Sequence, residues 1–343
     1  MRIAIDAREL QGRPTGVGRY LSGLLEAWRT LPSAAPHDFV LLAPRDGGGT
    51  LWEQFTLPRL VRKADAGVFF APGYTGPALC PVPMVVAIHD VSFAAHPEWF
   101  SWREGIRRRT LTRLAAKRAA RILTISEFSR GEIATRLGVS ESKIDVIYPA
   151  PATAVDARLD AGGRDPLVLY VGSLFTRRHI PELIGGFAQV AADTPDVRLE
   201  IVGDNRTTPP IDFARTVAAS GSVDRIVLRS YVPENELASL YSRARAFVFL
   251  SEYEGFGLTP LEALAAGIPI VVLDTPVARE VYGDAALYVS EPDPARIAAA
   301  VRRALFDEPE RARILAAARR MLPRYSWEGC AEQVLRVLLQ SSR

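Results

Sequence analysis

Short runs of β-branched and other apolar residues alternate with longer stretches of helical periodicity, and this alternation constrains the fold more than any other feature of the chain. In the first half the predicted strands are residues 2–6, 39–43, 84–89, 121–125 and 144–147. In the second half they are residues 167–171, 197–202, 225–228, 246–250, 269–273 and 287–289. Strands that alternate with helices in this way predict parallel sheets covered by helices.

Proline and glycine interrupt the pattern near the middle of the chain. Residues 148–151 contain two prolines and lead into residues 152–166, which have no strand pattern and include Gly162 and Gly163. Such a group of chain breakers predicts a boundary between domains. We therefore expect a first domain over residues 1–160 and a second over residues 161–325, each with its own parallel sheet. An amphipathic helix over about 326–343 is expected to cross back over the first domain.

The bulk composition limits the class of protein. At 343 residues, 48% of them hydrophobic, the chain can bury two cores. Its net charge of +3 is small for this length, so nucleic acid is not an expected partner. Cys80 and Cys330 are too few for a disulfide framework or a cysteine-rich zinc site. The sequence has no secretion-signal pattern and no apolar run near the roughly 20 residues of a spanning helix, which predicts a cytoplasmic protein.

The most informative segment, residues 251–262, follows a predicted strand and opens a helix. Open parallel sheets bind ligands beyond the carboxyl ends of their strands, so a ligand is expected here. Gly255 and Gly257 allow close approach to the backbone, and the amides at the start of a helix favour a phosphate. The Glu254 carboxylate either accepts hydrogen bonds from ligand hydroxyls or is a solvated loop acid. A sugar phosphate is the natural occupant.

Glu262 has two interpretations. Thr259 is the expected N-cap of the helix, Pro260 its first residue, and Glu262 the acid of a capping box three positions after the cap. A glutamate in that position needs no ligand. The alternative is a direct role in ligand binding, and spacing alone does not separate the two.

A second loop, residues 172–179, follows the predicted strand 167–171 and precedes a helix expected to begin near Pro181. Its adjacent Arg177 and Arg178 can hold a diphosphate, because the planar guanidinium matches phosphate oxygens and each charge-assisted hydrogen bond contributes about 1.5–3 kcal/mol. Two solvated arginines on a surface loop are the alternative.

In the first half, His89 follows a predicted strand, and Gly16, Val17 and Gly18 are expected in a glycine-rich loop before a helix. A histidine at a strand end is more often structural than catalytic. The glycines lack the spacing of a dinucleotide-binding motif, and P-loop, zinc-protease and serine-hydrolase motifs are absent. Asp-x-Asp is absent too, so cations and helix dipoles would have to neutralise a leaving diphosphate.

At these residues the chain resembles the retaining glycosyltransferases of family 4, also called glycosyltransferase group 1, which have the GT-B architecture. Glu254 and Glu262 reproduce the Glu-x7-Glu element of that family, and residues 171–174 lead to its basic pair. Other segments similar to the family or to its mannosyltransferase subgroup are residues 5–8, 15–20, 87–93, 96–100, 279–286 and 325–328. The resemblance extends over nearly the whole chain.

The resemblance implies two Rossmann-like, doubly wound α/β domains that face each other across a cleft, with the acceptor on the N-terminal side and the nucleotide sugar on the C-terminal side. The reaction it implies is metal-independent transfer of a hexose, with mannose favoured, to a glycan or a lipid-linked saccharide with net retention. The donor would be GDP-mannose, or a UDP-sugar or other nucleoside diphosphate sugar. The leaving phosphate would help to remove the acceptor proton, and domain closure would exclude water.

The resemblance also implies roles for single residues. Glu254 would contact the donor sugar and Glu262 the ribose, which favours ligand binding over capping at Glu262. Arg177 and Arg178 would hold the diphosphate, and His89 would line the reaction centre. The expected catalytic residues are His89, Arg177, Arg178 and Glu254, and the expected donor-binding residues are Gly16, Val17, Gly18, Gly172, Ser173, Val232, Gly255, Phe256, Gly257, Leu258, Thr259 and Glu262.

The chain departs from the family pattern at two places. Arg177, Arg178 and His179 stand where Arg-Lys-Asn is usual, and Leu250 and Ser251 stand where the family has Pro-Ser. Arginine keeps the charge of lysine but changes its reach and geometry. Two other functions therefore stay open: an epimerase or hydrolase of the activated sugar, and a non-catalytic nucleotide-sugar-binding subunit.

The segment from Trp102 to Arg121 has the pattern of a basic amphipathic helix. Its basic residues are Arg103, Arg107, Arg108, Arg109, Arg113, Lys117, Arg118 and Arg121, and the apolar positions expected to be buried are Ile106, Leu111, Leu114 and Ala115. A solvated face over a packed stripe is the ordinary interpretation. The alternative is peripheral contact with the anionic inner membrane face or a phosphate-bearing lipid-linked acceptor, at about 1 kcal/mol per basic residue.

Overall fold

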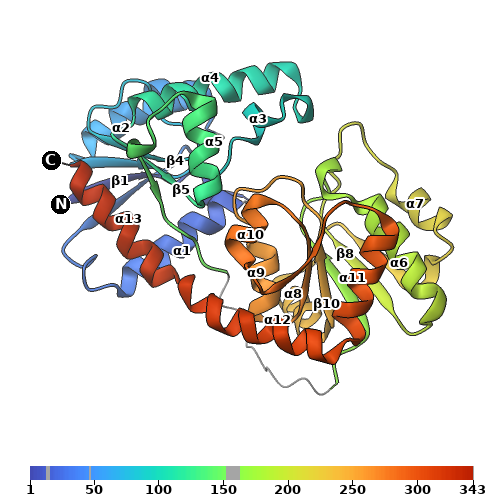
Figure 1. The fold of residues 1–343 in the computed structure, drawn as a ribbon. Coiled ribbons are helices and arrows are strands. Elements are labelled where there is room, and N and C mark those ends of the chain that lie inside the picture. Colours follow the sequence, from blue (N-terminus) through green and yellow to red (C-terminus); the bar gives the residue numbers. More distant parts are fainter. Residues whose placement is uncertain (13–15, 46–47, 152–162, 343) are drawn as a thin grey trace. The chain divides into compact units, whose positions relative to one another are not determined.

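The computed structural model describes residues 1–12, 16–45, 48–151 and 163–342. Within it the chain forms two compact units (Figure 1). Unit 1 consists of Met1–Ala150 and Tyr325–Arg343, and unit 2 consists of Pro151–Arg324. The predicted boundary between residues 160 and 161 lies outside the described residues.

Unit 1 is built on a six-stranded parallel sheet in the order β2-β1-β3-β4-β5-β6. The strands are β1 (Arg2–Asp6), β2 (Asp38–Leu42), β3 (Val68–Ala71), β4 (Met84–Ala87), β5 (Arg121–Thr124) and β6 (Ile144–Val146). Two separate clusters of buried apolar side chains accompany this sheet. All residues of β3 and β4 are buried, as expected for central strands covered on both faces.

The strand β3 is missing from the strands predicted from the sequence. Its residues form a continuous apolar run of four, and such a short run cannot be distinguished from buried helix by periodicity. Gly67 before it and Pro72 after it were the available signals, because these residues often bound a strand. β3 pairs with both β1 and β4, so it lies in the middle of the sheet.

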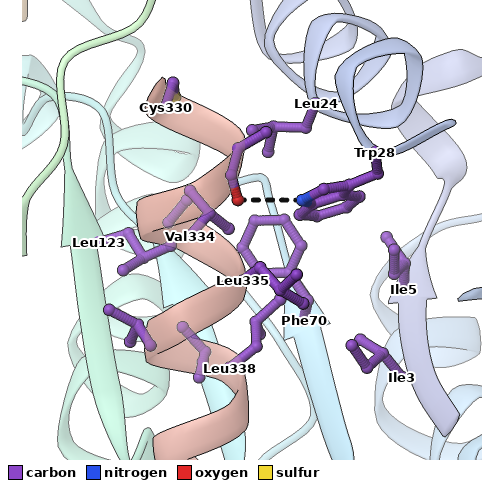
Figure 2. Close-up of a cluster of buried hydrophobic side chains, with 14 of the residues drawn as sticks. Ile3, Ile5, Leu24, Trp28, Phe70, Leu123, Cys330, Val334, Leu335 and Leu338 are labelled. Carbon is purple, nitrogen blue, oxygen red and sulfur yellow. Dashed lines mark hydrogen bonds between the residues drawn. The ribbon is translucent and has the colours of Figure 1, made fainter. Parts of the chain in front are cut away.

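The last helix, α13 (Trp327–Ser341), contributes to the core of unit 1 together with α1 (Gly16–Thr30). The indole nitrogen of Trp28 donates a hydrogen bond of 3.0 Å to the carbonyl of Ala331 (Figure 2). Gly23 is required where the two helices meet, because a Cβ there would lie 2.6 Å from the Trp327 ring. The side chains around this contact in Figure 2 include Ile3, Ile5, Leu24, Phe70, Leu123, Val334, Leu335 and Leu338. Burial of each such side chain contributes about 1.5–3 kcal/mol.

The start of α1 corrects a prediction. Gly16, Val17 and Gly18 form the first turn of this helix and not a loop before it, while Thr15 lies outside the described residues. The other helices of unit 1 are η1 (Arg8–Leu10), η2 (Trp52–Thr56), α2 (Leu57–Lys63), α3 (Ser92–Ala95), η3 (Pro97–Trp99), α4 (Trp102–Arg118), α5 (Glu127–Leu137) and η4 (Glu141–Lys143).

Unit 2 repeats the plan with a second six-stranded parallel sheet, in the order β12-β11-β10-β7-β8-β9. The strands are β7 (Leu167–Val171), β8 (Arg198–Val202), β9 (Ile226–Arg229), β10 (Ala246–Phe249), β11 (Ile270–Leu273) and β12 (Ala286–Val289). The central neighbours β7 and β10 are far apart in the sequence. The loops that follow them therefore start side by side at the carboxyl edge of the sheet.

In the described part of unit 2, three α-helices, which begin at Ile180, Glu234 and Leu258, have no side-chain cap, whereas four others begin at ordinary side-chain caps. The side chains of Asp293 and Asp307 accept backbone hydrogen bonds at the starts of two of them, α11 and α12. Gly186 allows close contact between α6 and α11, because a Cβ there would lie 2.8 Å from Ile297. The helices are η5 (Thr176–Arg178), α6 (Ile180–Asp193), α7 (Phe213–Ala219), η6 (Val223–Arg225), α8 (Glu234–Arg243), α9 (Leu258–Ala265), α10 (Pro276–Tyr282), α11 (Pro294–Phe306), α12 (Glu308–Met321) and η7 (Leu322–Arg324).

Candidate functional site

The structure brings together two of the predicted site residues in unit 2. Arg178 comes from the loop after β7, and Glu254 comes from the loop after the neighbouring strand β10. The Arg178 guanidinium donates from Nε at 3.0 Å and from an η nitrogen at 2.7 Å to the same Glu254 oxygen, Oε1. Ser251 donates a further hydrogen bond of 2.8 Å to that oxygen. Ser251 was not among the site residues predicted from the sequence, and here it supports the carboxylate.

The Arg178 guanidinium is enclosed on its other sides. It lies 4.7 Å from the ring centre of Phe249 and 5.4 Å from that of Phe175, and it donates a hydrogen bond of 2.8 Å to the carbonyl of Ser173. Burial disfavours the charged guanidinium, but the charges of Glu254 and Tyr170 and their hydrogen bonds with Arg178 together outweigh burial and raise the pKa of Arg178. The group therefore stays charged, although only 12% of the side chain is exposed.

The neighbours of Arg178 on both sides are also charged or titratable. The Arg177 guanidinium lies 4.2 Å from the Phe175 ring centre. His179 has a left-handed backbone with φ of 50°, and its Nε2 lies 2.7 Å from Glu252 Oε1. Burial alone would lower the pKa of His179, but its hydrogen bond with Glu182 and the charges of both glutamates raise that pKa above its ordinary value.

The glycine loop before α9 corrects the predicted helix start. The helix begins at Leu258 with Gly257 as N-cap, whose φ is 96°, and no side chain caps it, so Thr259 is not the N-cap. A Cβ at Gly257 would lie 2.0 Å from the Tyr282 hydroxyl, which donates a 2.8 Å hydrogen bond to the Gly257 carbonyl. The uncapped amino terminus leaves the amide dipoles of the first turn for a ligand. Gly255 and Phe256, just before it, are buried.

Glu262 is not the acid of a capping box, because the helix starts two residues earlier than that motif requires and no side chain caps it. It lies in the second turn of α9 and is 5% exposed. Its Oε2 accepts a hydrogen bond of 3.1 Å from the Tyr241 hydroxyl of α8. The carboxylate is therefore held by tertiary contacts between α8 and α9.

The other predicted donor-binding residues of unit 2 also follow strands of this sheet. Gly172 directly follows β7, where a Cβ would lie 2.8 Å from an Arg178 nitrogen, so only glycine fits beside the guanidinium. The next residue, Ser173, contributes the carbonyl that Arg178 contacts. Val232 lies between β9 and α8 and is 6% exposed. A cavity of about 10 Å³ between Glu254 and Tyr282 has room for roughly one water molecule.

In unit 1, His89 lies two residues past the end of β4 and is buried. Its Nε2 lies 2.8 Å from the carbonyl of Pro72, which can only accept, so Nε2 carries the proton and Nδ1 is left as the acceptor of the neutral ring. Burial lowers the pKa of His89, which keeps the imidazole neutral near pH 7. The ring centres of Tyr20 and Tyr74 lie 4.8 Å and 5.5 Å from that of His89, both edge-on.

The predicted glycines of α1 lie near the same edge of unit 1. A Cβ at Gly73, in the loop after β3, would lie 3.3 Å from a methyl group of Val17, and Tyr20 of the same helix reaches the His89 ring. The structure thus brings Val17 and His89 into one neighbourhood. Tyr74 was not identified from the sequence, and the Pro72-Gly73 pair after an apolar run is the signal that could have indicated its loop.

The basic helix is shorter than predicted, and of the four positions expected to be buried only Ala115 is fully buried, while Leu111 and Leu114 are half-buried. α4 ends at Arg118, and Arg121 is the first residue of β5, where it pairs with Asp145 at 2.5 Å. Ile106, expected to be buried, is 50% exposed, and Trp102 is 69% exposed. The fully buried positions of the helix are Gly105, Thr112, Ala115 and Ala116. None of the helices in the described ranges is long and apolar enough to cross a membrane.

The described residues contain no cluster of metal-ligating side chains. Among the described residues, no group of three or more His, Cys, Asp or Glu side chains could hold a metal ion. The charges at the carboxyl edge of unit 2 are instead arranged as ion pairs.

Two family models match this chain. The one described as Glycosyltransferase Family 4 matches residues 16–153, and the one described as Glycosyl transferases group 1 matches residues 153–321. Together they extend over most of both units. The chain belongs to the glycosyltransferases of family 4 and group 1.

Curated relatives include mannosyltransferases. The chain is 29% identical to the O-antigen chain mannosyltransferase B of Escherichia coli over 266 residues. This match covers 73% of this chain and 68% of the relative. It is 29% identical to the GDP-mannose:cellobiosyl-diphosphopolyprenol alpha-mannosyltransferase of Xanthomonas campestris over 201 residues. This match covers 57% of this chain and 50% of the relative. The matched region thus spans about two thirds of the first relative and half of the second.

A solved structure with the same architecture is that of HepE from Anabaena in complex with UDP-glucose. The TM-score is 0.76 at 18% identity, over 99% of this chain and 100% of that chain. At this identity the likeness shows the fold, which is the GT-B fold of two Rossmann-like domains. The fold predicted from the sequence is confirmed.

Proposed function

We propose that this chain transfers a hexose from a nucleoside diphosphate sugar to a saccharide acceptor, with retention at the anomeric carbon. The observation that carries the proposal is the contact of Arg178 with Glu254 at the carboxyl edge of unit 2, beside an uncapped helix start. A cation and helix amides suit a diphosphate, and a carboxylate suits sugar hydroxyls. A nucleotide sugar presents both groups in one molecule.

Unit 2 is the proposed donor-binding domain. Arg177 and Arg178 hold the diphosphate together with the amides at the start of α9, while Glu254 accepts hydrogen bonds from hydroxyls of the sugar. Glu262 binds the ribose. The proposed contacts to the rest of the donor come from the predicted residues Gly172, Ser173, Val232, Gly255, Phe256, Gly257, Leu258 and Thr259.

Unit 1 is the proposed acceptor-side domain. The neutral His89 ring presents Nδ1 as a hydrogen-bond acceptor, because Nε2 already donates to Pro72. A sugar hydroxyl is the donor that this nitrogen fits. Gly16, Val17 and Gly18 lie at the start of α1, whose amides favour a phosphate.

The proposed chemistry needs no covalent bond to the protein. The bond between the anomeric carbon and the diphosphate oxygen breaks, and the acceptor oxygen forms its new bond on the same face of the sugar. The acceptor proton passes to the leaving phosphate. Arg177 and Arg178 stabilise the negative charge that develops on this phosphate, which is the largest contribution that fixed charges make to such a step.

The proposed donor is GDP-mannose, and the proposed acceptor is a lipid-linked saccharide. The support is that one relative is named a GDP-mannose:cellobiosyl-diphosphopolyprenol mannosyltransferase and another an O-antigen chain mannosyltransferase. UDP-sugars are the alternative donors, since the structurally similar HepE was solved with UDP-glucose.

We test the function with a thermal-shift panel of GDP, UDP, ADP, dTDP and their mannose and glucose conjugates. A ligand that binds the folded state raises Tm by mass action, about 2.7 kcal/mol of stabilisation at one hundred times Kd. We expect one nucleotide to raise Tm, and we expect Arg178→Ala and Glu262→Ala to abolish the shift. Arg320→Ala, at an exposed position of α12, is the control and should keep it. No shift with any nucleotide would contradict the proposal.

Product analysis with the nucleotide that binds separates the alternatives. Transfer requires an acceptor, and we expect glycosylated acceptor when extracted lipid-linked saccharide is supplied. Free sugar or an epimerised donor without any acceptor would instead identify a hydrolase or an epimerase. Binding with no turnover of any donor would identify a non-catalytic binding subunit.

The helix α4 is proposed as a peripheral contact with an anionic membrane. Trp102 and Ile106 are exposed and four positions apart, so they lie on one face of the helix, and Arg103 and Arg107 follow each of them directly. Indole and aliphatic side chains among arginines suit the interface of an anionic bilayer. This surface would bring the enzyme to a lipid-linked acceptor.

Sedimentation with liposomes tests this contact. We expect binding to vesicles that contain phosphatidylglycerol and not to neutral phosphatidylcholine vesicles, with a decrease as salt is raised. Arg103→Ala with Arg107→Ala should weaken binding at least about tenfold, at roughly 1 kcal/mol per charge. Arg319→Ala with Arg320→Ala removes the same charge from an exposed part of unit 2 and should have no effect. Equal weakening by both pairs would contradict a specific role of α4.

A further inference from the structure

Tyr74 has a backbone conformation that its side chain disfavours. Its φ is 65°, in the left-handed region, which is unfavourable for a bulky residue. Among the described residues, Asp65 and His179 are the other non-glycine residues with positive φ. Asp65 follows the end of α2, where helices often finish in this conformation, and His179 directly precedes α6. Tyr74 adjoins no helix, so its surroundings must hold it there.

The loop around Tyr74 is held by contacts from two directions. The Tyr74 amide donates a 2.8 Å hydrogen bond to the carbonyl of Ala87, at the end of β4. The Thr75 hydroxyl donates a 2.6 Å hydrogen bond to Glu53, and Arg8 pairs with the same carboxylate oxygen at 2.6 Å. Glu53 is 2% exposed, so this anchor is an internal one. A strained residue persists only where its neighbours fix it, and strain of this kind concentrates at functional sites.

The Tyr74 side chain contacts His89 and Asp90, the second and third residues after β4. Its ring lies edge-on to His89, with 5.5 Å between ring centres, and its hydroxyl donates a 2.7 Å hydrogen bond to Asp90 Oδ2. The other oxygen of Asp90 accepts the Ser92 amide at 2.8 Å. Tyr20 contacts the His89 ring at 4.8 Å. One residue thus contacts both a neutral imidazole and the carboxylate beside it.

We propose that Tyr74 is a positioning residue of the transfer site, which fixes the His89 imidazole and the Asp90 carboxylate at the carboxyl end of β4. This inference rests on the proposed function for its catalytic consequence, but its structural part does not. The Tyr74 backbone is strained because the loop after β3 must both hydrogen-bond to the end of β4 and place an aromatic ring beside His89. A glycine would relieve the strain but would leave His89 without this contact.

The charge on Asp90 links Tyr74 to the pKa of His89. The titratable groups around the imidazole are Asp90, Glu9 of η1, and the hydroxyls of Tyr20 and Tyr74. Burial lowers the pKa of His89, while the hydrogen bond with the Pro72 carbonyl and then the charges of Asp90 and Glu9 oppose this effect. Tyr74→Phe removes the hydrogen bond to Asp90 and leaves its negative charge less neutralised. The pKa of His89 should then rise.

NMR of the histidine side chains tests the structural part without any substrate. The chain has four histidines, and His89→Asn identifies the resonance of His89 by its loss. We expect the Nε2-protonated form in the wild type, a higher pKa in Tyr74→Phe, and a mixture of tautomers in Tyr74→Ala. Asp65→Gly is the matched control, because Asp65 also has positive φ but lies before β3, at the opposite end from Tyr74. It should leave the resonance of His89 unchanged.

Steady-state kinetics with the donor identified by thermal shift tests the catalytic part. We expect Tyr74→Phe to lower kcat about tenfold and Tyr74→Ala about 100-fold, with the KM for the donor changed less than about threefold and Asp65→Gly near wild type. The proposal is overturned if Tyr74→Phe and Tyr74→Ala match Asp65→Gly in the pKa and tautomer of His89 and in kcat. If no donor is turned over, the proposed function fails, whereas an altered His89 resonance would still support the positioning role.

Discussion

The carboxyl edges of the two sheets have the same architecture but are built around different polar groups. In unit 1 the edge is formed around His89, a neutral imidazole between Tyr20 and Tyr74. In unit 2 it is formed around Arg178, a charged guanidinium paired with Glu254. The fold therefore determines where a ligand can bind, and the loops determine which chemistry is available there.

Two histidines show the same contrast. Burial lowers the pKa of His89, which has a carbonyl as its hydrogen-bond partner. The pKa of His179 is raised because Glu182 and Glu252 outweigh the effect of burial. An edge that keeps histidine neutral suits uncharged sugar hydroxyls, whereas an edge that concentrates charge suits a diphosphate. The comparison supports a donor phosphate in unit 2 and a sugar near His89 in unit 1.

The largest expected effect comes from removing the charge of Glu254. Glu254→Gln leaves the enclosed Arg178 guanidinium without its counter-ion, which costs about 3–5 kcal/mol for a buried pair. It also removes an acceptor for the donor sugar, so kcat/KM should fall on the order of 100- to 1000-fold. Urea unfolding and steady-state kinetics measure the two effects.

Glu252→Gln is the matched control for this variant. Glu252 is two residues away, and its side chain is 45% exposed. It should lose less than about 1 kcal/mol, because exposed charge pairs contribute little. If the two variants were equally stable and equally active, the charged edge of unit 2 would have no special role.

A smaller effect is expected where the chain departs from its family. Arg178→Lys restores the usual residue but cannot donate from two nitrogens to Glu254 while also reaching the Ser173 carbonyl. We expect kcat/KM to fall about tenfold, with the nucleotide still binding in the thermal-shift assay. An Arg178→Lys variant as active as the wild type would show that charge alone matters at this position.

The smallest expected effect is the pH dependence of stability that a histidine contributes at each edge, beginning with His179 in unit 2. Because the pKa of His179 is raised on folding, its contribution to stability is complete below its unfolded pKa, near 6.5, and is lost as pH rises through the folded value. We expect wild type to exceed His179→Asn in stability by up to about 1 kcal/mol at pH 5.5, and the difference to shrink by pH 8.5.

His89 should show the opposite dependence. Its pKa is lowered on folding, so its contribution is present above pH about 6.5 and is lost as pH falls below that value. Thermal unfolding of His89→Asn and His179→Asn across this range gives both curves. If both stability differences changed in the same direction with pH, the contrast between the edges would be contradicted.

Much of the fold was predictable because its signals are local. Alternating apolar runs predicted parallel sheets, and the loops at residues 172–179 and 251–262 were expected to follow strands, as they do. β3 was missed because four apolar residues have no detectable period. The predicted start of α9 was wrong because Thr259 and Pro260 make a good cap and first turn by local rules, whereas in the structure Gly257 is the N-cap, in contact with Tyr282, and the helix begins at Leu258.

The candidate site was predicted in part. Arg178 and Glu254 were each selected from the sequence, but their contact depends on β7 and β10 being neighbours, which no local pattern contains. Tyr74 was missed because its importance lies in a backbone strain and a contact with His89 that arise from the packing of the loops after β3 and β4. The roles assigned to these residues stay predictions until the variants are measured.

The sequence by itself determined the class of fold, the edge of each sheet at which ligands are expected, and most of the charged residues there, because periodicity and residue type act over short distances. Only the tertiary structure decided which charges neutralise each other, which histidine is neutral, and where a strained tyrosine is held. These properties depend on burial and on distances between segments far apart in the chain, and the energy of a charge depends on both.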